Sequence, residues 1–237
     1  MEVFRTRSFD VVQQENVMKV NSDAILLGAW ADYSGSENIL DIGTGTGIIA
    51  MIAAQKSDAS RIVGIEISEP CCKEGAENFK QSIYSDRLEA ICESIQDYAQ
   101  FSQDKYDLIV SNPPFFTGGT FSDNENRNNV RNTIRLSHGD LLIAVRKLLS
   151  PQGRFYVILP YLEGERLIDM AARYDLYPSS ILEVRGKSDK PIERLVISLS
   201  FQISSDELSR SELVMYEDDG SYTDAYIKLT EDILTIS

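Results

Sequence analysis

Cysteine is scarce in this 237-residue chain, which contains only Cys71, Cys72 and Cys92. The number is odd, two of the three are adjacent, and no Cys-x-x-Cys spacing occurs. Zinc sites and disulfide frameworks usually have other cysteine numbers and spacings, so this pattern argues against both. We therefore predict three free thiols in a reducing compartment, and no metal.

Long hydrophobic runs are also missing. The longest one extends from Ile48 to Ala54, far short of the roughly 20 residues that cross a bilayer. Residues 1–7 carry charge from Glu2 onward and lack the apolar centre of a signal peptide. We expect a soluble, cytoplasmic protein.

Positive charge is in deficit, since the net charge is −14, and this argues against a protein that coats nucleic acid passively. The distribution is uneven. Residues 127–194 hold 12 Lys and Arg against 8 Asp and Glu, whereas the rest of the chain holds 11 against 29. A relatively basic segment on an acidic body can be an RNA-facing surface or an ordinary solvated face, and charge alone leaves both open.

The chain is rich in short apolar strands that alternate with helices of roughly 10–15 residues. Predicted strands lie at 38–41, 61–66, 88–92, 106–111, 153–159, 179–184 and 195–201, and predicted helices at 48–54, 69–81, 137–149 and 160–174. This alternation is typical of an α/β fold with a mostly parallel, seven-stranded sheet and helices on both faces. Residues 186–191 alone connect the last two strands, so we expect the last strand to be antiparallel.

The length fits one large domain. We predict a single domain over residues 1–237, made of an N-terminal lid or helical segment (1–37), a catalytic core (38–201) and an acidic C-terminal appendage (202–237). The appendage can hold an extra strand at 213–216 and a terminal helix.

Glycines alternate strictly in the turn between the first core strand and its helix, at Gly43, Gly45 and Gly47, with Asp41 just ahead of them. Glycines there let the backbone approach a ligand closely. The spacing differs from the G-x-G-x-x-G of dinucleotide enzymes. Glu66 ends the next strand, where a carboxylate can accept hydrogen bonds from both hydroxyls of a ribose.

This combination resembles the class I S-adenosylmethionine (SAM)-dependent methyltransferases, and it implies their Rossmann-like fold. In that family the glycine loop wraps the methionine part of SAM, and the acid holds the ribose. An aspartate after the third strand often binds the adenine, where this chain has Ser94, with Asp97 three residues later. The cofactor-binding residues that we predict are Lys19, Asp41, Gly43, Thr44, Gly45, Gly47, Glu66, Ile67, Ser94, Ile95 and Asn112.

The segment Asn112-Pro113-Pro114-Phe115 follows the fourth strand, at the edge where α/β sheets bind their ligands. An adenine or glutamine amino group is a poor nucleophile, because its lone pair is delocalised. Two acceptors aimed at its N–H bonds localise that lone pair and stabilise the charge that develops on nitrogen. The side-chain carbonyl of Asn112 and the backbone carbonyl of Pro113 can supply them.

In the same segment Pro113 and Pro114 stiffen the loop, and Phe115 can stack on a planar target. The four residues resemble the (N/D/S)-P-P-(Y/F/W) signature of amino-methyltransferases. We predict that all four are catalytic and that the reaction needs no metal. The motif does not distinguish between the planar nitrogens that such enzymes methylate.

A further resemblance covers nearly the whole chain. The segment Lys19-Val20-x-x-Asp23-x-x-Leu26-Leu27-Gly28-x-Trp30, with the glycine loop, the Asn112 motif and Leu159-Pro160, is similar to the tRNA1(Val) (adenine-37-N6)-methyltransferase family. The resemblance implies methyl transfer from SAM to N6 of an adenine in the anticodon loop of tRNA. Extruding a base from a single-stranded loop costs little. Lys19 can meet the carboxylate of SAM, or it can be a solvated lysine on a lid helix.

The chain departs from this family after the Asn112 motif. An Ala-Arg-His or Ala-Arg-Tyr triplet is expected there, and residues 134–138 read Ile-Arg-Leu-Ser-His instead. We expect His138, the only histidine, to be exposed in the first turn of a helix that Ser137 caps. Arg127, Arg131 and Arg135 are predicted to contact RNA.

Other functions share parts of this pattern. A glutamine-N5 protein methyltransferase, or another RNA or DNA amino-methyltransferase, would carry the same motif. The glutamine enzymes usually have a sizeable helical N-terminal domain, and only about 37 residues precede the first core strand here. A non-catalytic SAM-binding module would not need an intact Asn112-Pro113-Pro114. The oligomeric state is open, and we expect a monomer.

Overall fold

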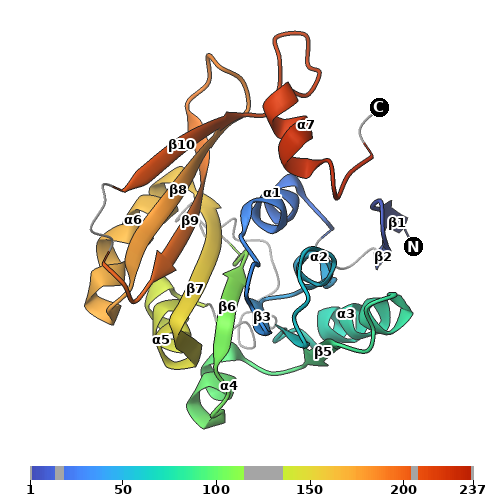
Figure 1. The fold of residues 1–237 in the computed structure, drawn as a ribbon, viewed down its shortest axis with the longest axis vertical. Coiled ribbons are helices and arrows are strands. Elements are labelled where there is room, and N and C mark those ends of the chain that lie inside the picture. The colour runs from blue at the N-terminus through green and yellow to red at the C-terminus, as the bar shows by residue number, and fades with distance from the viewer. Residues whose placement is uncertain (1, 14–18, 115–135, 204–207, 236–237) are drawn as a thin grey trace, which may run out of the picture.

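A computed structural model describes residues 2–13, 19–114, 136–203 and 208–235 (Figure 1). Eight strands form one sheet in the order β10-β8-β9-β7-β6-β3-β4-β5. Their bounds are β3 (Asn38–Ile42), β4 (Arg61–Ile65), β5 (Leu88–Ile91), β6 (Tyr106–Ser111), β7 (Leu149–Pro160), β8 (Tyr177–Arg185), β9 (Ile192–Ser200) and β10 (Ser209–Val214). The strands predicted from the sequence are therefore present.

The direction of each strand confirms a mostly parallel sheet with an antiparallel seventh core strand. β9 runs antiparallel to both of its neighbours, β7 and β8, and the other pairings are parallel. The predicted strand number is wrong by one, because β10 pairs with β8 and extends the sheet to eight strands. Without it β8 would be an edge strand with unpaired backbone groups.

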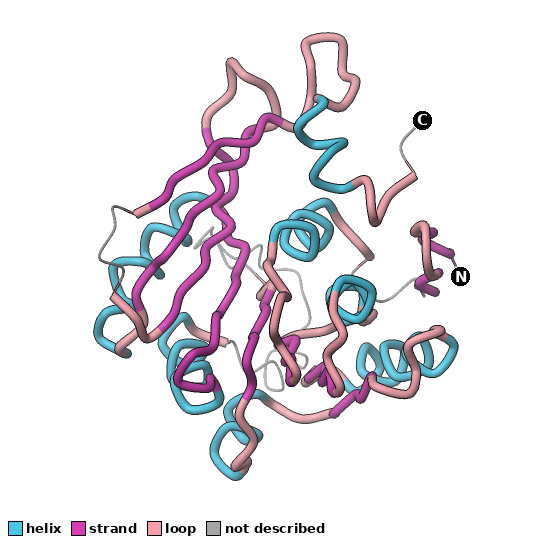
Figure 2. The backbone as a smooth tube through the Cα atoms, in the orientation of Figure 1, coloured by secondary structure: helices cyan, strands magenta, loops and turns pink. Residues whose placement is uncertain are grey.

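Helices cover both faces of the sheet (Figures 1 and 2). On one face lie α1 (Ser22–Trp30), α2 (Ile48–Lys56), α3 (Glu69–Gln81) and α7 (Asp224–Thr230), and on the other lie α4 (Ile95–Phe101), α5 (His138–Leu148), α6 (Tyr161–Ala171) and a 3-10 turn (Ala172–Tyr174). Alternate residues of each strand point to opposite faces. In β6, Leu108 and Val110 therefore join the first hydrophobic cluster, while Ile109 joins the second.

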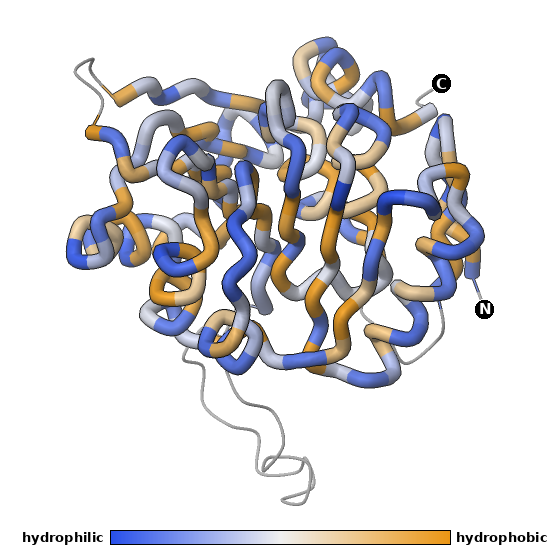
Figure 3. Tube along the Cα trace, turned by 60° about the horizontal axis from the view of Figure 1, so that its bottom comes forward, coloured by the Kyte–Doolittle hydropathy of each residue, from blue (hydrophilic) through white to orange (hydrophobic). Residues whose placement is uncertain are grey.

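Apolar residues gather on the central strands, and polar residues on the outer loops (Figure 3). Among the described residues no helix is both long enough and apolar enough to cross a membrane.

The amino terminus forms a hairpin that the sequence analysis did not predict. β1 (Glu2–Arg5) and β2 (Asp10–Gln13) pair antiparallel. The side chain of Asn78, on α3, both donates to the carbonyl of Val12 and accepts from its N–H, each at 3.0 Å. This long-range contact docks the hairpin onto α3, and a pattern confined to neighbouring residues does not predict it.

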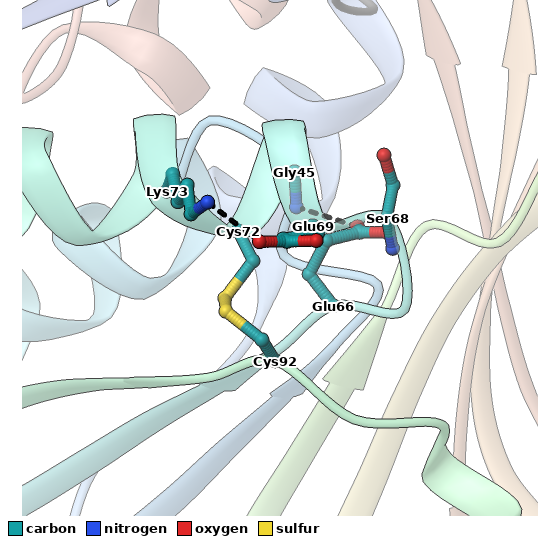
Figure 4. The surroundings of a disulfide bond; sticks show 7 residues. All are labelled: Gly45, Glu66, Ser68, Glu69, Cys72, Lys73 and Cys92. Atoms are coloured by element: carbon teal, nitrogen blue, oxygen red, sulfur yellow. Dashed lines mark hydrogen bonds and ion pairs between the residues drawn. A yellow bond between two sulfur atoms is a disulfide. The ribbon is translucent and has the colours of Figure 1, made fainter.

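Cys72 and Cys92 form a disulfide (Figure 4). The expectation of three free thiols is therefore wrong, and Cys71 is the free cysteine. Cys72 lies near the start of α3 and Cys92 directly after β5. α3 follows β4, and β4 pairs with β5. The Cα atoms of Cys72 and Cys92 lie 5.5 Å apart, a distance that suits a disulfide. Counting cysteines cannot detect such a contact.

Candidate active site

The glycine loop and the Asn112 motif leave the sheet side by side. β3 and β6 are neighbouring parallel strands, and their last residues, Ile42 and Ser111, are register partners. From β3 the chain continues to β4 and β5 on one side, and from β6 to β7 on the other. Ligands of α/β sheets bind at such a reversal of strand order, beyond the carboxyl ends of the strands.

The backbone of the glycine loop adopts positive φ angles, which residues with a side chain rarely adopt. Gly43, Gly45 and Gly47 have φ of 75°, 54° and 87°. A Cβ at Gly47 would lie 2.3 Å from the ring of Phe79, whereas one at Gly43 or Gly45 would meet nothing within 4 Å. Gly47 is thus required for the packing of α3, and open space beside the other two glycines lets a ligand approach the backbone.

Asp41 holds the glycine loop through hydrogen bonds to its carboxylate. Its Oδ2 accepts hydrogen bonds from Thr44 Oγ1 at 2.7 Å and from the Ala50 N–H at 3.2 Å, which joins the loop to α2. Its Oδ1 is buried and has no hydrogen-bond partner among the described residues. Burial, with the nearby charge of Glu66, raises the pKa of Asp41 to about 7, although the two hydrogen bonds oppose the shift.

Glu66 lies at the rim of the loop, directly after β4 (Figure 4). Its Oε2 accepts from the Gly45 N–H at 3.1 Å, and its Oε1 accepts from the Ser68 N–H at 2.8 Å. A carboxylate has about four lone-pair positions, so capacity remains for two ribose hydroxyls. Ile67 follows it and is 45% exposed, which leaves an apolar surface beside the carboxylate.

Ser94 and Ile95 lie at the start of α4, which follows β5, the neighbour of β4 in the sheet. The Ser94 hydroxyl accepts from the Asp97 N–H at 3.0 Å and donates to Asp97 Oδ2 at 2.6 Å, so it caps the helix. Ser94 and Ile95 are both buried. The Cys72–Cys92 disulfide crosslinks the chain segment just before Ser94 to α3, which begins just after the Glu66 corner.

Lys19, one of the predicted cofactor residues, has a charged partner within the chain. Lys19 forms an ion pair with Glu2 of the hairpin, and both side chains are exposed. Asp23 accepts from Arg194 Nε at 2.9 Å, which joins α1 to β9, while Asn21 caps α1 by accepting from the Ala24 N–H.

Asn112 follows β6 and is half-buried. Among the described residues, none forms a hydrogen bond with its side chain. Pro113 is buried and Pro114 exposed. Phe115, Arg127, Arg131 and Arg135 lie outside the described residues, so their predicted roles stay predictions.

His138 is not the exposed residue that the sequence analysis expected. Ser137 does cap α5, by accepting from the Asp140 N–H at 3.1 Å, but the His138 side chain is only 21% exposed. Its Nε2 lies 3.6 Å from Oε2 of Glu163, in the first turn of α6. Burial lowers the pKa of His138, and so does the charge of Arg166, whereas Glu163 opposes the shift. Neither the pair nor Glu163 was predicted, because their contact depends on how α5 and α6 pack.

Six of the nine lysine and arginine residues in the described part of the basic segment, residues 136–194, are in ion pairs. Ion pairs join Arg146 to Asp175, Arg154 to Asp32, Arg166 to Glu163, Arg185 to Glu212, Lys190 to Asp189 and Arg194 to Asp23. Of the two interpretations of this segment, its described residues favour the solvated face. No cluster of three possible metal ligands occurs among the residues that the structure describes.

Comparison with known proteins identifies the class of fold. A family model described as a methyltransferase domain matches residues 34–190. The structure is similar to that of a predicted O-methyltransferase from Agrobacterium tumefaciens, with a TM-score of 0.66, 16% identity, and coverage of 89% of this chain and 96% of that one. A TehB-like SAM-dependent methyltransferase from Corynebacterium glutamicum gives a TM-score of 0.50 at 17% identity, over 77% and 88% of the two chains.

Sequence relatives are more specific. The tRNA1(Val) (adenine(37)-N6)-methyltransferase of Bacteroides fragilis (strain YCH46) is 38% identical over 232 residues, which are 97% of this chain and 96% of the relative. The protein with the same name from Proteus mirabilis (strain HI4320) is 36% identical over 223 residues, or 93% and 88% of the two chains. This chain therefore belongs to the tRNA1(Val) (adenine(37)-N6)-methyltransferase family, within the methyltransferases of the class I fold.

Proposed function

We propose that this protein transfers a methyl group from SAM to N6 of an adenine in tRNA, namely adenine 37 in the anticodon loop of tRNA1(Val). The observation that carries the proposal is the exit of the glycine loop and the Asn112 motif from adjacent strands, β3 and β6. The first is suited to a methyl donor and the second to a planar amino group. Family membership supports the choice of nucleotide and tRNA.

The residues of the glycine loop fit SAM as the cofactor. The open space beside Gly43 and Gly45 can take the methionine part, and Glu66, held by two backbone N–H groups, can accept from the ribose. Ile67, Ser94 and Ile95 adjoin that corner. Bound SAM supplies an electrophilic methyl group on a sulfonium sulfur.

Asn112 and Pro113 act on the nucleophile. The side-chain carbonyl of Asn112 and the backbone carbonyl of Pro113 accept the two amino hydrogens, so the nitrogen lone pair is directed at the methyl carbon. With SAM bound, the new nitrogen–carbon bond would form as the carbon–sulfur bond breaks, the electron pair of that bond would leave with the sulfur as S-adenosylhomocysteine, and the proton released by the nitrogen would pass to water. Acceptors held by the stiff Pro113-Pro114 segment would need little reorganisation. Phe115 would stack on the base.

RNA contacts and the setting of the reaction are part of the same proposal. Arg127, Arg131 and Arg135 follow the Asn112 motif in the chain and would contact the phosphates of the anticodon loop. We propose a cytoplasmic monomer with one domain, in which residues 38–201 are the catalytic core between the segment 1–37 and the segment 202–237.

Purified protein tests the proposal directly. It should methylate tRNA1(Val), and nucleoside mass analysis should place N6-methyladenosine at position 37 and nowhere in a transcript with guanine there. A glutamine-N5 activity is not favoured by the relatives. Methylation of a release-factor peptide without methylation of any tRNA would replace the RNA proposal with the protein one.

A further inference from the structure

The Cys72–Cys92 disulfide crosslinks the two chain segments on either side of the proposed cofactor site (Figure 4). Cys72 is the fourth residue of α3, and α3 begins shortly after Glu66, which is proposed to hold the ribose. Cys92 directly follows β5 and lies two residues before Ser94, which occupies the position expected for the adenine contact. One covalent bond therefore connects the ribose side of the site to the adenine side.

The helix that carries Cys72 also lies against the backbone of the glycine loop. A Cβ at Gly75 of α3 would lie 2.7 Å from the carbonyl oxygen of Gly45, so helix and loop are in close contact. The Asn78 side chain, one turn later, donates to the carbonyl of Thr46 at 2.9 Å. A shift of α3 is therefore transmitted to the loop that is proposed to hold the methionine part of SAM.

The other end of the crosslink lies where the sheet is least supported. β5 has four residues, none of them fully buried, and it is the last strand of the sheet, paired among the described strands with β4 alone. The Glu66 N–H donates to the carbonyl of Ile91 at 3.0 Å, directly before Cys92. A short, partly exposed edge strand has low local stability. The disulfide thus supplies a restraint on the segment leading to Ser94 that the sheet provides only weakly.

The two sulfur atoms of the crosslink differ in their access to solvent. Cys72 is 0% exposed, whereas Cys92 is an exposed residue. A thiolate of a dithiol reductant therefore attacks Sγ of Cys92, the S–S bond breaks, and Cys72 leaves as a thiolate that takes up a proton. The second thiolate of the reductant then displaces Cys92, which takes up a proton in turn. Two electrons and two protons pass from the reductant to the protein, and the reductant becomes a disulfide.

The adjacent Cys71 does not compete in this exchange. Burial raises the pKa of the Cys71 thiol, and so do the charges of Glu66 and Glu74, although a hydrogen bond with Ser68 opposes the shift. Cys71 is therefore held as a thiol, which is a poor nucleophile in comparison with a thiolate. The crosslink can open and close between the same two cysteines.

We propose that the Cys72–Cys92 pair is a redox switch of the cofactor site, which binds SAM more tightly when the pair is oxidised. The inference rests on the proposed function, because SAM is the ligand whose affinity changes. In the oxidised protein the two sides of the site are already held together, whereas in the reduced protein the ligand must order them at a cost in entropy. The coupling is reciprocal, so SAM favours disulfide formation by the same factor.

Two measurements on the purified protein test this coupling. Calorimetry compares SAM binding by the oxidised protein with binding by protein kept reduced with excess dithiothreitol, and circular dichroism checks that both are folded. We expect the reduced protein to bind SAM about fivefold more weakly or worse, at the lower end of usual couplings between two sites. Thiol counting across buffers of oxidised and reduced dithiothreitol then gives the midpoint of reduction. Saturating SAM should shift this midpoint by the factor found in the calorimetry.

Cysteine variants provide the controls. Cys92→Ser should bind SAM as weakly as the reduced protein and should not respond to dithiothreitol. Cys71→Ser keeps the crosslink and should behave as wild type in both redox states. If Cys92→Ser does not fold, reduced wild type carries the test, since its sequence is unchanged. Equal SAM affinity in the two redox states, or a midpoint that SAM does not shift, would overturn the inference. If neither redox state bound SAM, the proposed function would fail and this inference with it.

Discussion

The hydroxyl of Ser111 donates a hydrogen bond to the carbonyl oxygen of Ile42, at 2.9 Å, across the paired ends of β6 and β3. Both residues are buried. Each is followed by a loop of the proposed active site, so this contact lies where the spacing between methyl donor and acceptor is set. A site whose two halves begin on rigid strand ends loses little entropy on binding its substrates.

Glu66→Ala should weaken SAM binding by about 1–3 kcal/mol, because hydrogen bonds to a charged group are lost. Isothermal titration of the isolated protein would measure it. Glu69→Ala is the matched control, because Glu69 is the next acidic residue after Glu66 and forms an exposed ion pair with Lys73. Wild-type affinity in Glu66→Ala would remove Glu66 from the ribose site.

Asn112→Ala should lower kcat by a factor on the order of 10² or more and leave SAM affinity within a few-fold, because Asn112 is proposed to act on the nucleophile. Single-turnover methylation of tRNA and calorimetry separate the two effects. Asn38→Ala, at the opposite end of β3, should leave the rate unchanged. A loss of only a few-fold in Asn112→Ala would contradict the polarising mechanism.

Asp41 makes stability depend on pH. Its pKa rises from an ordinary 3.8 to about 7 in the folded protein, so the native state holds a proton that the unfolded chain releases between those values. The free energy of unfolding should therefore fall by a few kcal/mol, to order of magnitude, as pH rises from about 4 to 7. Asp41→Asn should flatten this fall in urea titrations at several pH values. Identical slopes in the two proteins would show that Asp41 ionises normally.

Reduction of the Cys72–Cys92 disulfide should lower the free energy of unfolding by about 2–4 kcal/mol, since the crosslink restricts the unfolded chain. Denaturant unfolding of the oxidised and reduced protein measures the difference. Cys92→Ser should match the reduced protein, and Cys71→Ser should match the oxidised one. Thiol titration of the unfolded, unreduced chain should count one thiol, and a count of three would contradict the crosslink.

Arg131→Ala should reduce the dependence of tRNA binding on salt, lowering the slope by about 0.7, because one phosphate contact is lost. The loss of affinity should be similar for different tRNAs, since phosphates carry no sequence information.

Phe115→Ala should weaken the free energy of RNA binding by about 1–3 kcal/mol when the target adenine is present, because base stacking is lost, and by almost nothing with an abasic site there. Binding across a salt series to both RNAs checks the pair, and an unchanged slope in Arg131→Ala would exclude that arginine from the interface.

The local sequence determined most of the fold. The bounds of α3 and β6 and the cap of α5 at Ser137 agree with prediction, because helix and strand periods and capping residues act over a few neighbours. The glycine loop and the motif at Asn112 were recognisable for the same reason. Each is a short segment whose residue types are required by its own chemistry.

Only the tertiary structure decided how distant segments meet. It joined Cys72 to Cys92, placed His138 against Glu163, paired Lys19 with Glu2 and added β10 to the sheet. Each contact depends on the packing of elements that are separated in the chain, and no spacing in the sequence encodes their distance. Periodicity determines which face of an element is buried, whereas the partner on that face is chosen by the shape and hydrogen bonding of the assembled core.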